Sequence, residues 1–148
     1  ANIINKVREK DFMYIRNCIL ELFRLNNPVN STFRSLLVDH TFSPEYSLKK
    51  GDQLLIINNP VLRDPVKFPE PDKYIPERWN TELEKSYYSI MFNQGPQKCP
   101  GKEMSIMFLF TYITRYLDIV DIASVEPKID IDNVPQIINP FKIKIKLS

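Results

Sequence analysis

A cysteine stands at the start of an apolar segment, in the stretch FNQGPQKCPGKE at residues 92–103. Pro100 follows Cys99 and suits the first position of a helix, where no backbone N–H is needed. The first N–H groups of a helix have no partners within it, and the helix dipole is positive at that end. Both effects stabilise a thiolate over a thiol, and Lys98 and Lys102 add positive potential. A thiolate placed here could act as a nucleophile, a redox sensor or a metal ligand.

The residues alone leave a plainer interpretation open, since lone cysteines are often unreactive members of an apolar core. A zinc site is poorly supported, because Cys18, Cys99 and His40 lack the spacing of zinc ligands. A cysteine hydrolase would need a histidine partner, and the single histidine of the chain, His40, lies in the polar stretch VDHTFSPEY. The second cysteine, Cys18, sits among apolar residues and is expected in the core.

Two pairs of charged residues could fix the elements around this thiol. Glu21 and Arg24 are three residues apart and therefore share one face of a helix, where an isolated pair is usually a weak surface contact. Glu77 and Arg78 belong to the sequence PERW at residues 76–79, inside a stretch rich in proline. Taken alone, that second pair indicates only a charged turn.

Two helices are predicted by apolar spacing. Residues 11–25 carry apolar side chains at helical intervals, and the sequence NNP after them ends the helix. Residues 100–117 are apolar nearly all round, so this helix is expected to be buried on most sides, with Met104, Met107, Phe108 and Phe110 in the core.

Strands are predicted near the middle and the C-terminus of the chain. Residues 53–57 form a short apolar run typical of a buried strand, and prolines in 60–79 exclude a long helix or strand there. Residues 128–132 and 141–147 alternate between apolar and polar, so we expect them to pair as a C-terminal hairpin within 128–147. The sequence therefore predicts a mainly α architecture with small β-sheets at the rim (α+β).

Composition narrows the function classes. The chain of 148 residues is 43% hydrophobic and 26% charged, which is typical of one folded domain. A net charge of +2 without a basic stripe argues against nucleic-acid binding.

No apolar run is long enough to span a membrane, and the N-terminus is too polar for a signal peptide. Two cysteines form no disulfide framework, so we expect a reducing, intracellular compartment. Without an initiator Met, the chain is expected to be a processed product or part of a longer protein.

Three motifs in order resemble the cytochrome P450 family: E-x-x-R at 21–24, P-E-R-W at 76–79 and F-x-x-G-x-x-x-C-x-G at 92–101. The segment LRDPVKFPEPDKYIPERW is also similar to the stretch that precedes the haem loop in that family. The resemblance runs from about residue 11 to the C-terminal strands. It implies the C-terminal third of the P450 fold across 1–148, with a meander in 53–79 and a haem-thiolate loop at 92–101.

The resemblance also implies haem as cofactor and roles for individual residues. Cys99 would be the thiolate ligand of the iron, with Phe92 packed beside the sulfur. Gly95 would allow the tight turn under the porphyrin, and Gly101 would let the helix start close to it. Arg34 falls where the family often has an arginine that reaches a haem propionate.

A second set of residues would have a structural role. Glu21, Arg24 and Arg78 would form the buried cluster that joins the meander and the cysteine loop to the first helix. Three positions depart from the family pattern: Gln97 replaces a common Arg or His, Asn93 replaces a frequent glycine, and Leu62 stands where the family has a histidine. The family's long distal helix, with its acid and threonine, precedes the segment seen here, so no catalytic residue is assigned.

Three functions remain open at this point. The first is a P450-type monooxygenase that oxidises an apolar small molecule with O₂, using electrons from a reductase docked near Lys98 and Lys102. The second is a P450-like hydroperoxide isomerase or lyase that needs no reductase. The third is a truncated relic or interaction module without haem, since one face of the cofactor would be bare in this chain.

Overall fold

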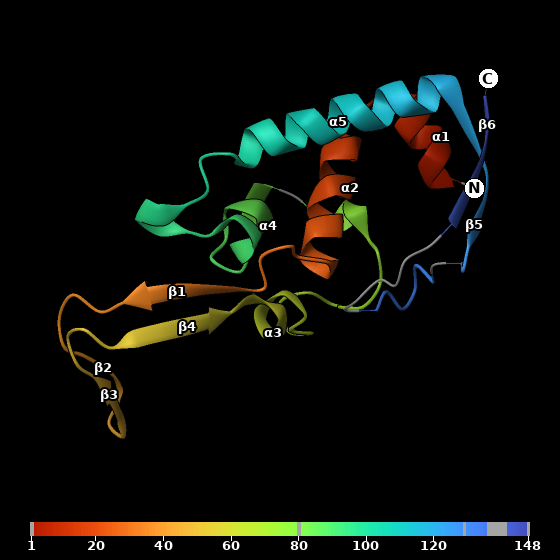
Figure 1. Cartoon of the computed structure of the whole chain (residues 1–148). Coiled ribbons are helices and arrows are strands. Elements are labelled where there is room, and N and C mark those ends of the chain that lie inside the picture. The colour runs from red at the N-terminus through yellow and green to blue at the C-terminus, as the bar shows by residue number, and fades with distance from the viewer. Residues whose placement is uncertain (1, 80, 129, 136–141, 148) are drawn as a thin grey trace.

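The computed structural model describes residues 2–79, 81–128, 130–135 and 142–147 and shows helices with small sheets, as predicted (Figure 1). Its helices are α1 (Asn2–Arg8), α2 (Phe12–Leu25), α3 (Asn58–Leu62), α4 (Thr81–Lys85) and α5 (Lys102–Ile119), with single 3₁₀ turns η1 (Pro76–Arg78), η2 (Ile90–Phe92) and η3 (Gly95–Gln97). Its strands are β1 (Ser31–Ser35), β2 (His40–Ser43), β3 (Tyr46–Leu48), β4 (Gln53–Ile57), β5 (Val120–Glu126) and β6 (Lys142–Leu147).

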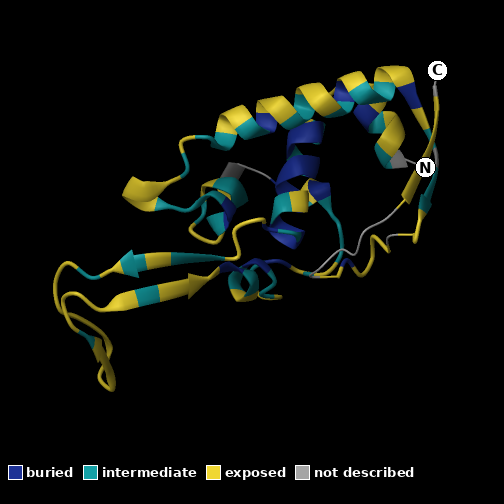
Figure 2. Ribbon diagram, viewed as in Figure 1, coloured by how far each residue is buried: buried dark blue, intermediate teal, exposed yellow. Residues whose placement is uncertain are grey.

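Helix α2 is the centre of the molecule and is buried along most of its length (Figure 2). The Asp11 side chain caps its start by accepting hydrogen bonds from the backbone N–H groups of Met13 and Tyr14. The helix contacts α5, α1 and η1. The core therefore gathers around it, from Val7, Ile15, Ile19, Leu20, Leu62, Phe68, Trp79, Met91 and Ile106.

The burial of helix α5 differs from what its sequence predicts. It begins at Lys102 and ends at Ile119, and Ile106 and Thr114 are its buried residues. Met104 is 73% exposed and Phe108 69%, and Met107 is exposed as well, so the expectation that these side chains lie in the core is wrong. Phe110 is half-buried and packs edge-on against Phe12. No described element covers the outer face of α5, and its apolar sequence alone could not reveal that.

The sheets are three separate antiparallel pairs: β1 with β4, β2 with β3, and β5 with β6. In the first pair Ser31 lies opposite Ile57 and Arg34 opposite Leu54. The strand at 53–57 was predicted to be buried, but β4 is largely exposed, because none of the described helices covers this pair (Figure 2).

The C-terminal hairpin has a different first strand from the one predicted. Strand β6 pairs with β5 at 120–126, not with residues 128–132. Of that segment, Ile131 accepts a hydrogen bond from the backbone N–H of Tyr74 at 2.8 Å and so attaches to the meander. Ile129 and Phe141, which also belong to the predicted hairpin, lie outside the described residues.

The proline-rich stretch 60–79 forms no long helix or strand, as expected, but winds through α3, several turns and η1. Among the described helices, none combines the length and apolar character needed to cross a bilayer.

Candidate functional site

The loop that carries Cys99 is closed by its own backbone. The N–H of Cys99 donates to the carbonyl of Phe92 at 2.7 Å, across the turn formed by η3. Within that turn, the N–H of Lys98 donates to the carbonyl of Gly95 at 3.2 Å. Cys99 is a free, half-buried thiol two residues before the N-cap of α5. The loop therefore presents the sulfur next to the positive end of a long helix.

Two residues of the loop need unusual backbone angles. Asn93 has φ of 59° and Gly95 has φ of 73°, both in the left-handed region. Asn93 is among the residue types that tolerate this region, and its Oδ1 lies 3.0 Å from Thr32 Oγ1, which donates to it. This contact connects the loop to β1. A glycine at position 95 is favoured by the backbone itself, because a Cβ there would meet no atom within 4 Å.

We expect Gly95→Ala to lower the free energy of unfolding by about 1 kcal/mol, because only the left-handed backbone opposes the new Cβ. The matched control is Gly101→Ala. A Cβ at Gly101 would make an ordinary contact with Cys99 Sγ at 3.7 Å, and φ at this position is −85°. Urea unfolding of both variants checks the difference, and equal losses would contradict the role of φ at Gly95.

Phe92 joins the loop to the central helix. Its ring packs edge-on against Phe23 of α2, with 5.2 Å between ring centroids. The ammonium of Lys102 lies 5.9 Å from the centroid of the Phe92 ring. Helix α2 and the start of α5 therefore both contact Phe92, the residue that bonds to the backbone of Cys99.

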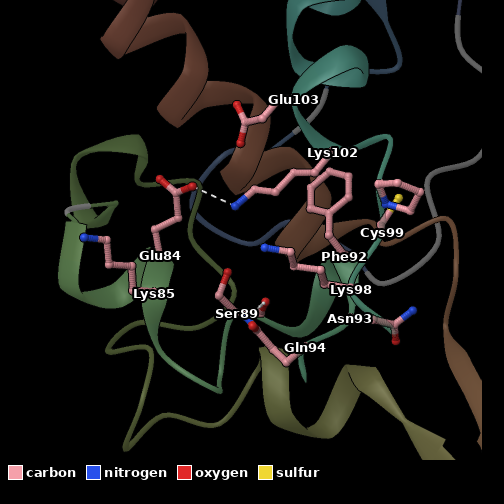
Figure 3. A pocket seen from close by; sticks show the side chains of 11 residues that line it. Glu84, Lys85, Ser89, Phe92, Asn93, Gln94, Lys98, Cys99, Lys102 and Glu103 are labelled. Carbon is pink, nitrogen blue, oxygen red and sulfur yellow. Dashed lines mark hydrogen bonds and ion pairs between the residues drawn. The ribbon is translucent and has the colours of Figure 1, made fainter. Parts of the chain in front are cut away.

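A hollow of about 430 Å³ lies beside this loop. Figure 3 shows the Glu84–Lys102 ion pair on one side of the hollow and the sulfur of Cys99 on the other. Of the two lysines predicted to face a partner, Lys98 is exposed, whereas Lys102 donates to Glu84 at 2.7 Å. The remaining lining residues are Lys85, Ser89, Phe92, Asn93, Gln94, Pro100 and Glu103.

The structure brings Glu21, Arg24 and Arg78 together. Glu21 and Arg24 are fully buried, and Arg24 donates from Nε and Nη2 to the two carboxylate oxygens at 2.9 and 2.8 Å. Arg78 Nε donates to the same carboxylate at 3.0 Å. Arg24 also donates to carbonyls of the meander, at Leu62 and Pro71. The cluster therefore attaches the meander to α2.

Two further partners of Glu21 were not identified from the sequence. Trp79 Nε1 donates to the carboxylate at 2.8 Å, and the backbone N–H of Ile75 donates at 3.0 Å. The sequence PERW contains the signal for the first of them, because a buried indole N–H needs an acceptor.

Arg34 lies on β1, and its Nη1 donates to the carbonyl of Phe33 at 2.9 Å. Side chains two residues apart point to the same face of a strand, so Arg34 shares its face with Thr32, which contacts the cysteine loop through Asn93. The strand thus places a guanidinium on the side of β1 that meets the loop.

Cys18 differs from Cys99 in its surroundings. It is buried in α2, and its carbonyl accepts a hydrogen bond from the hydroxyl of Tyr74 at 3.0 Å. Burial raises the pKa of the Cys18 thiol, so it favours the neutral form. This is the environment of an unreactive core cysteine.

The donor set at Cys99 fits haem. The described residues contain no group of three or more His, Cys, Asp and Glu side chains that could hold a metal ion. Haem needs few protein ligands, because the porphyrin supplies four nitrogen donors, and one thiolate serves as the protein ligand in one class of haem proteins. The half-buried Cys99 is a free thiol that lines the hollow, and Gly101 places no Cβ beside its sulfur.

Comparison with known families gives a direct match. The sequence profile of the family Cytochrome P450 matches residues 7–145. A beta-amyrin 28-monooxygenase of Barbarea vulgaris is 30% identical over 135 residues, which cover 89% of this chain and 28% of that protein. A (21S)-21-acetyl-1-hydroxy-apo-melianone synthase of Melia azedarach is 32% identical over 108 residues, covering 73% of this chain and 22% of the relative. The chain thus spans less than a third of the length of these relatives.

The solved structures agree with the sequence comparison. The retinoic acid-bound cyanobacterial CYP120A1 superposes with a TM-score of 0.79 at 22% identity, covering 99% of this chain and 39% of that one. P450BioI, in complex with an acyl carrier protein ligated to hexadec-9Z-enoic acid, superposes with a TM-score of 0.63 at 20% identity, covering 82% of this chain and 30% of that one. Both similarities concern the fold.

Proposed function

Because this chain belongs to the cytochrome P450 family, whose members bind haem, we propose that it holds the haem of a P450-type monooxygenase through the thiolate of Cys99. The observation that carries the proposal is the position of this thiol. It is free, half-buried and held by the Cys99–Phe92 backbone bond just before α5. The sulfur thereby lies near the start of α5, where the helix dipole is positive.

The other residues of the loop shape the site around the sulfur. Phe92, whose carbonyl accepts the hydrogen bond from the Cys99 N–H, would pack beside the sulfur, while Gly95 forms the turn and Gly101 keeps the helix start free of a Cβ. Arg34, on the face of β1 that meets the loop, supplies a positive charge for a haem propionate. Glu21, Arg24 and Arg78 act at a distance by fixing the meander against α2.

Haem held by a thiolate supplies reductive activation of dioxygen, because the sulfur donates electron density that favours O–O cleavage. The named activities of relatives, such as beta-amyrin 28-monooxygenation, support an oxygenase acting on an apolar small molecule. Electrons would come from a reductase or another donor. Lys98 is the lysine of the loop that remains exposed for an acidic partner, since Lys102 is already paired with Glu84.

The test is the ferrous–CO absorption of the complete protein after loading with haem. Wild-type protein is expected to give the Soret band of a thiolate-ligated iron, and Cys99→Ser to lose it, because serine supplies no sulfur. Cys18→Ala is the matched control and is expected to keep the band, since Cys18 is buried in α2 away from the loop. A thiolate-type band that persists in Cys99→Ser would overturn the proposal.

A further inference from the structure

Four charged side chains from three helices form a cluster at the hollow beside the cysteine loop. Arg16 of α2 donates from Nη1 and Nη2 to the two carboxylate oxygens of Glu84 on α4, at 2.5 and 2.7 Å. Lys102 of α5 donates to the same carboxylate at 2.7 Å. Arg16 also reaches Glu103 at 3.0 Å. Glu84 is therefore the one member bonded to both α2 and α5, and we call this set the Glu84 cluster.

The Glu84 cluster is more than a set of solvated surface pairs. The side chain of Arg16 is 10% exposed and that of Glu84 24%, so both charges are largely withdrawn from water. Burial alone would raise the pKa of Glu84, but the hydrogen bonds from Arg16 and Lys102 outweigh it and hold the pKa below its usual value. A bidentate, partly buried pair of this kind has a defined geometry, unlike an exposed salt bridge.

The cluster is connected to both ends of the cysteine loop. At the far end of the loop, Lys102 lies in the first turn of α5 and places its ammonium 5.9 Å from the centroid of the Phe92 ring. At the near end, the side-chain amide of Gln94 donates to the carbonyls of Ser86 and Ser89, at 3.2 and 2.9 Å, in the segment that follows α4. If α4 is held in place, the contacts of Lys102 and of Gln94 with the loop are therefore held in place as well.

We propose that Glu84 is a positioning residue for the cysteine loop: it clamps α4 to α2 and α5 and thereby holds Cys99 in place for the iron. This role rests on the proposed haem ligation by Cys99. Loss of the Glu84 charge leaves the largely buried Arg16 with the exposed Glu103 as its remaining carboxylate partner and frees Lys102 beside Phe92. The clamp on the loop then opens, while the separate cluster of Glu21, Arg24 and Arg78 stays intact.

The experiment uses the complete, haem-loaded protein and the variant Glu84→Gln, which keeps the shape of the side chain but removes its charge. The matched control is Glu82→Gln, an exposed carboxylate on the same short helix. Hydrogen exchange of residues 92–101 is expected to be about tenfold faster in Glu84→Gln than in the control, since charge-assisted hydrogen bonds are lost. Exchange in β5 and β6 is expected to stay unchanged, and Glu84→Asp to give an intermediate rate.

A second readout follows the iron. On warming, the thiolate-type ferrous–CO band of Glu84→Gln is expected to disappear about tenfold faster than that of Glu82→Gln. If exchange in 92–101 and loss of the band match the control while only the melting temperature falls, the cluster is a general stabiliser and the proposal is overturned. If wild type shows no thiolate-type band but exchange in the loop still accelerates, ligation by Cys99 fails and the clamp stands.

Discussion

Replacing Glu21 with alanine is expected to lower the free energy of unfolding by about 3–5 kcal/mol, the cost of leaving a buried charge without its partner. Glu21 and Arg24 are both 0% exposed. The carboxylate accepts from Arg24, Arg78 and Trp79 and from the backbone of Ile75, so all these donors lose their acceptor at once. Urea unfolding of the chain, followed by circular dichroism, measures the loss.

Glu77→Ala is the control for that measurement. Glu77 precedes Arg78 in the same turn, but its side chain is 59% exposed and its contact with Lys6 spans 3.7 Å. Exposed pairs of this kind contribute about 0–1 kcal/mol, so the control is expected to unfold nearly as wild type does. A loss in Glu21→Ala within about 1 kcal/mol of the control would show that the buried carboxylate is not needed.

The elements that carry the site could be predicted from local sequence. The apolar period of residues 11–25 places Glu21 and Arg24 on one helical face, and Pro100 marks the start of the region that becomes α5. Local signals suffice here because helix spacing and caps depend on residues a few positions apart. The part played by Arg78 could not be derived that way, since 57 residues separate it from Glu21, and only the resemblance to a family indicated it.

Other contacts of the site have no local signal at all. Arg16 and Glu84 are 68 residues apart, and each alone looks like an ordinary surface charge. Strand β5 was missed because Val120–Glu126 continues directly from the helix without a breaking residue. The predicted strand at 128–132 alternates correctly, but Ile131 bonds instead to the backbone of Tyr74. In each case the structure depends on contacts between residues far apart in the sequence, which the local pattern does not indicate.

The burial of α5 likewise could not be predicted from the local sequence. Its sequence predicts burial on most sides, yet its outer face carries the exposed Met104 and Phe108. Apolar composition indicates which side chains would be stabilised by burial. It does not indicate whether a neighbouring element covers them. Side chains on the buried and on the exposed face of α5 are therefore expected to contribute differently to the free energy of unfolding.

Ile106→Ala is expected to lower the free energy of unfolding by about 2–5 kcal/mol, because it removes buried methyl groups and leaves a cavity against α2. Ile106 is 0% exposed and belongs to the central core with Ile15 and Trp79. Phe108→Ala on the same helix is the control: that side chain is 69% exposed, so its loss is expected to change stability by less than about 0.5 kcal/mol. Urea unfolding of this chain compares the two. Equal losses would mean that the outer face of α5 is packed as tightly as the inner one, which would contradict the exposure of Phe108.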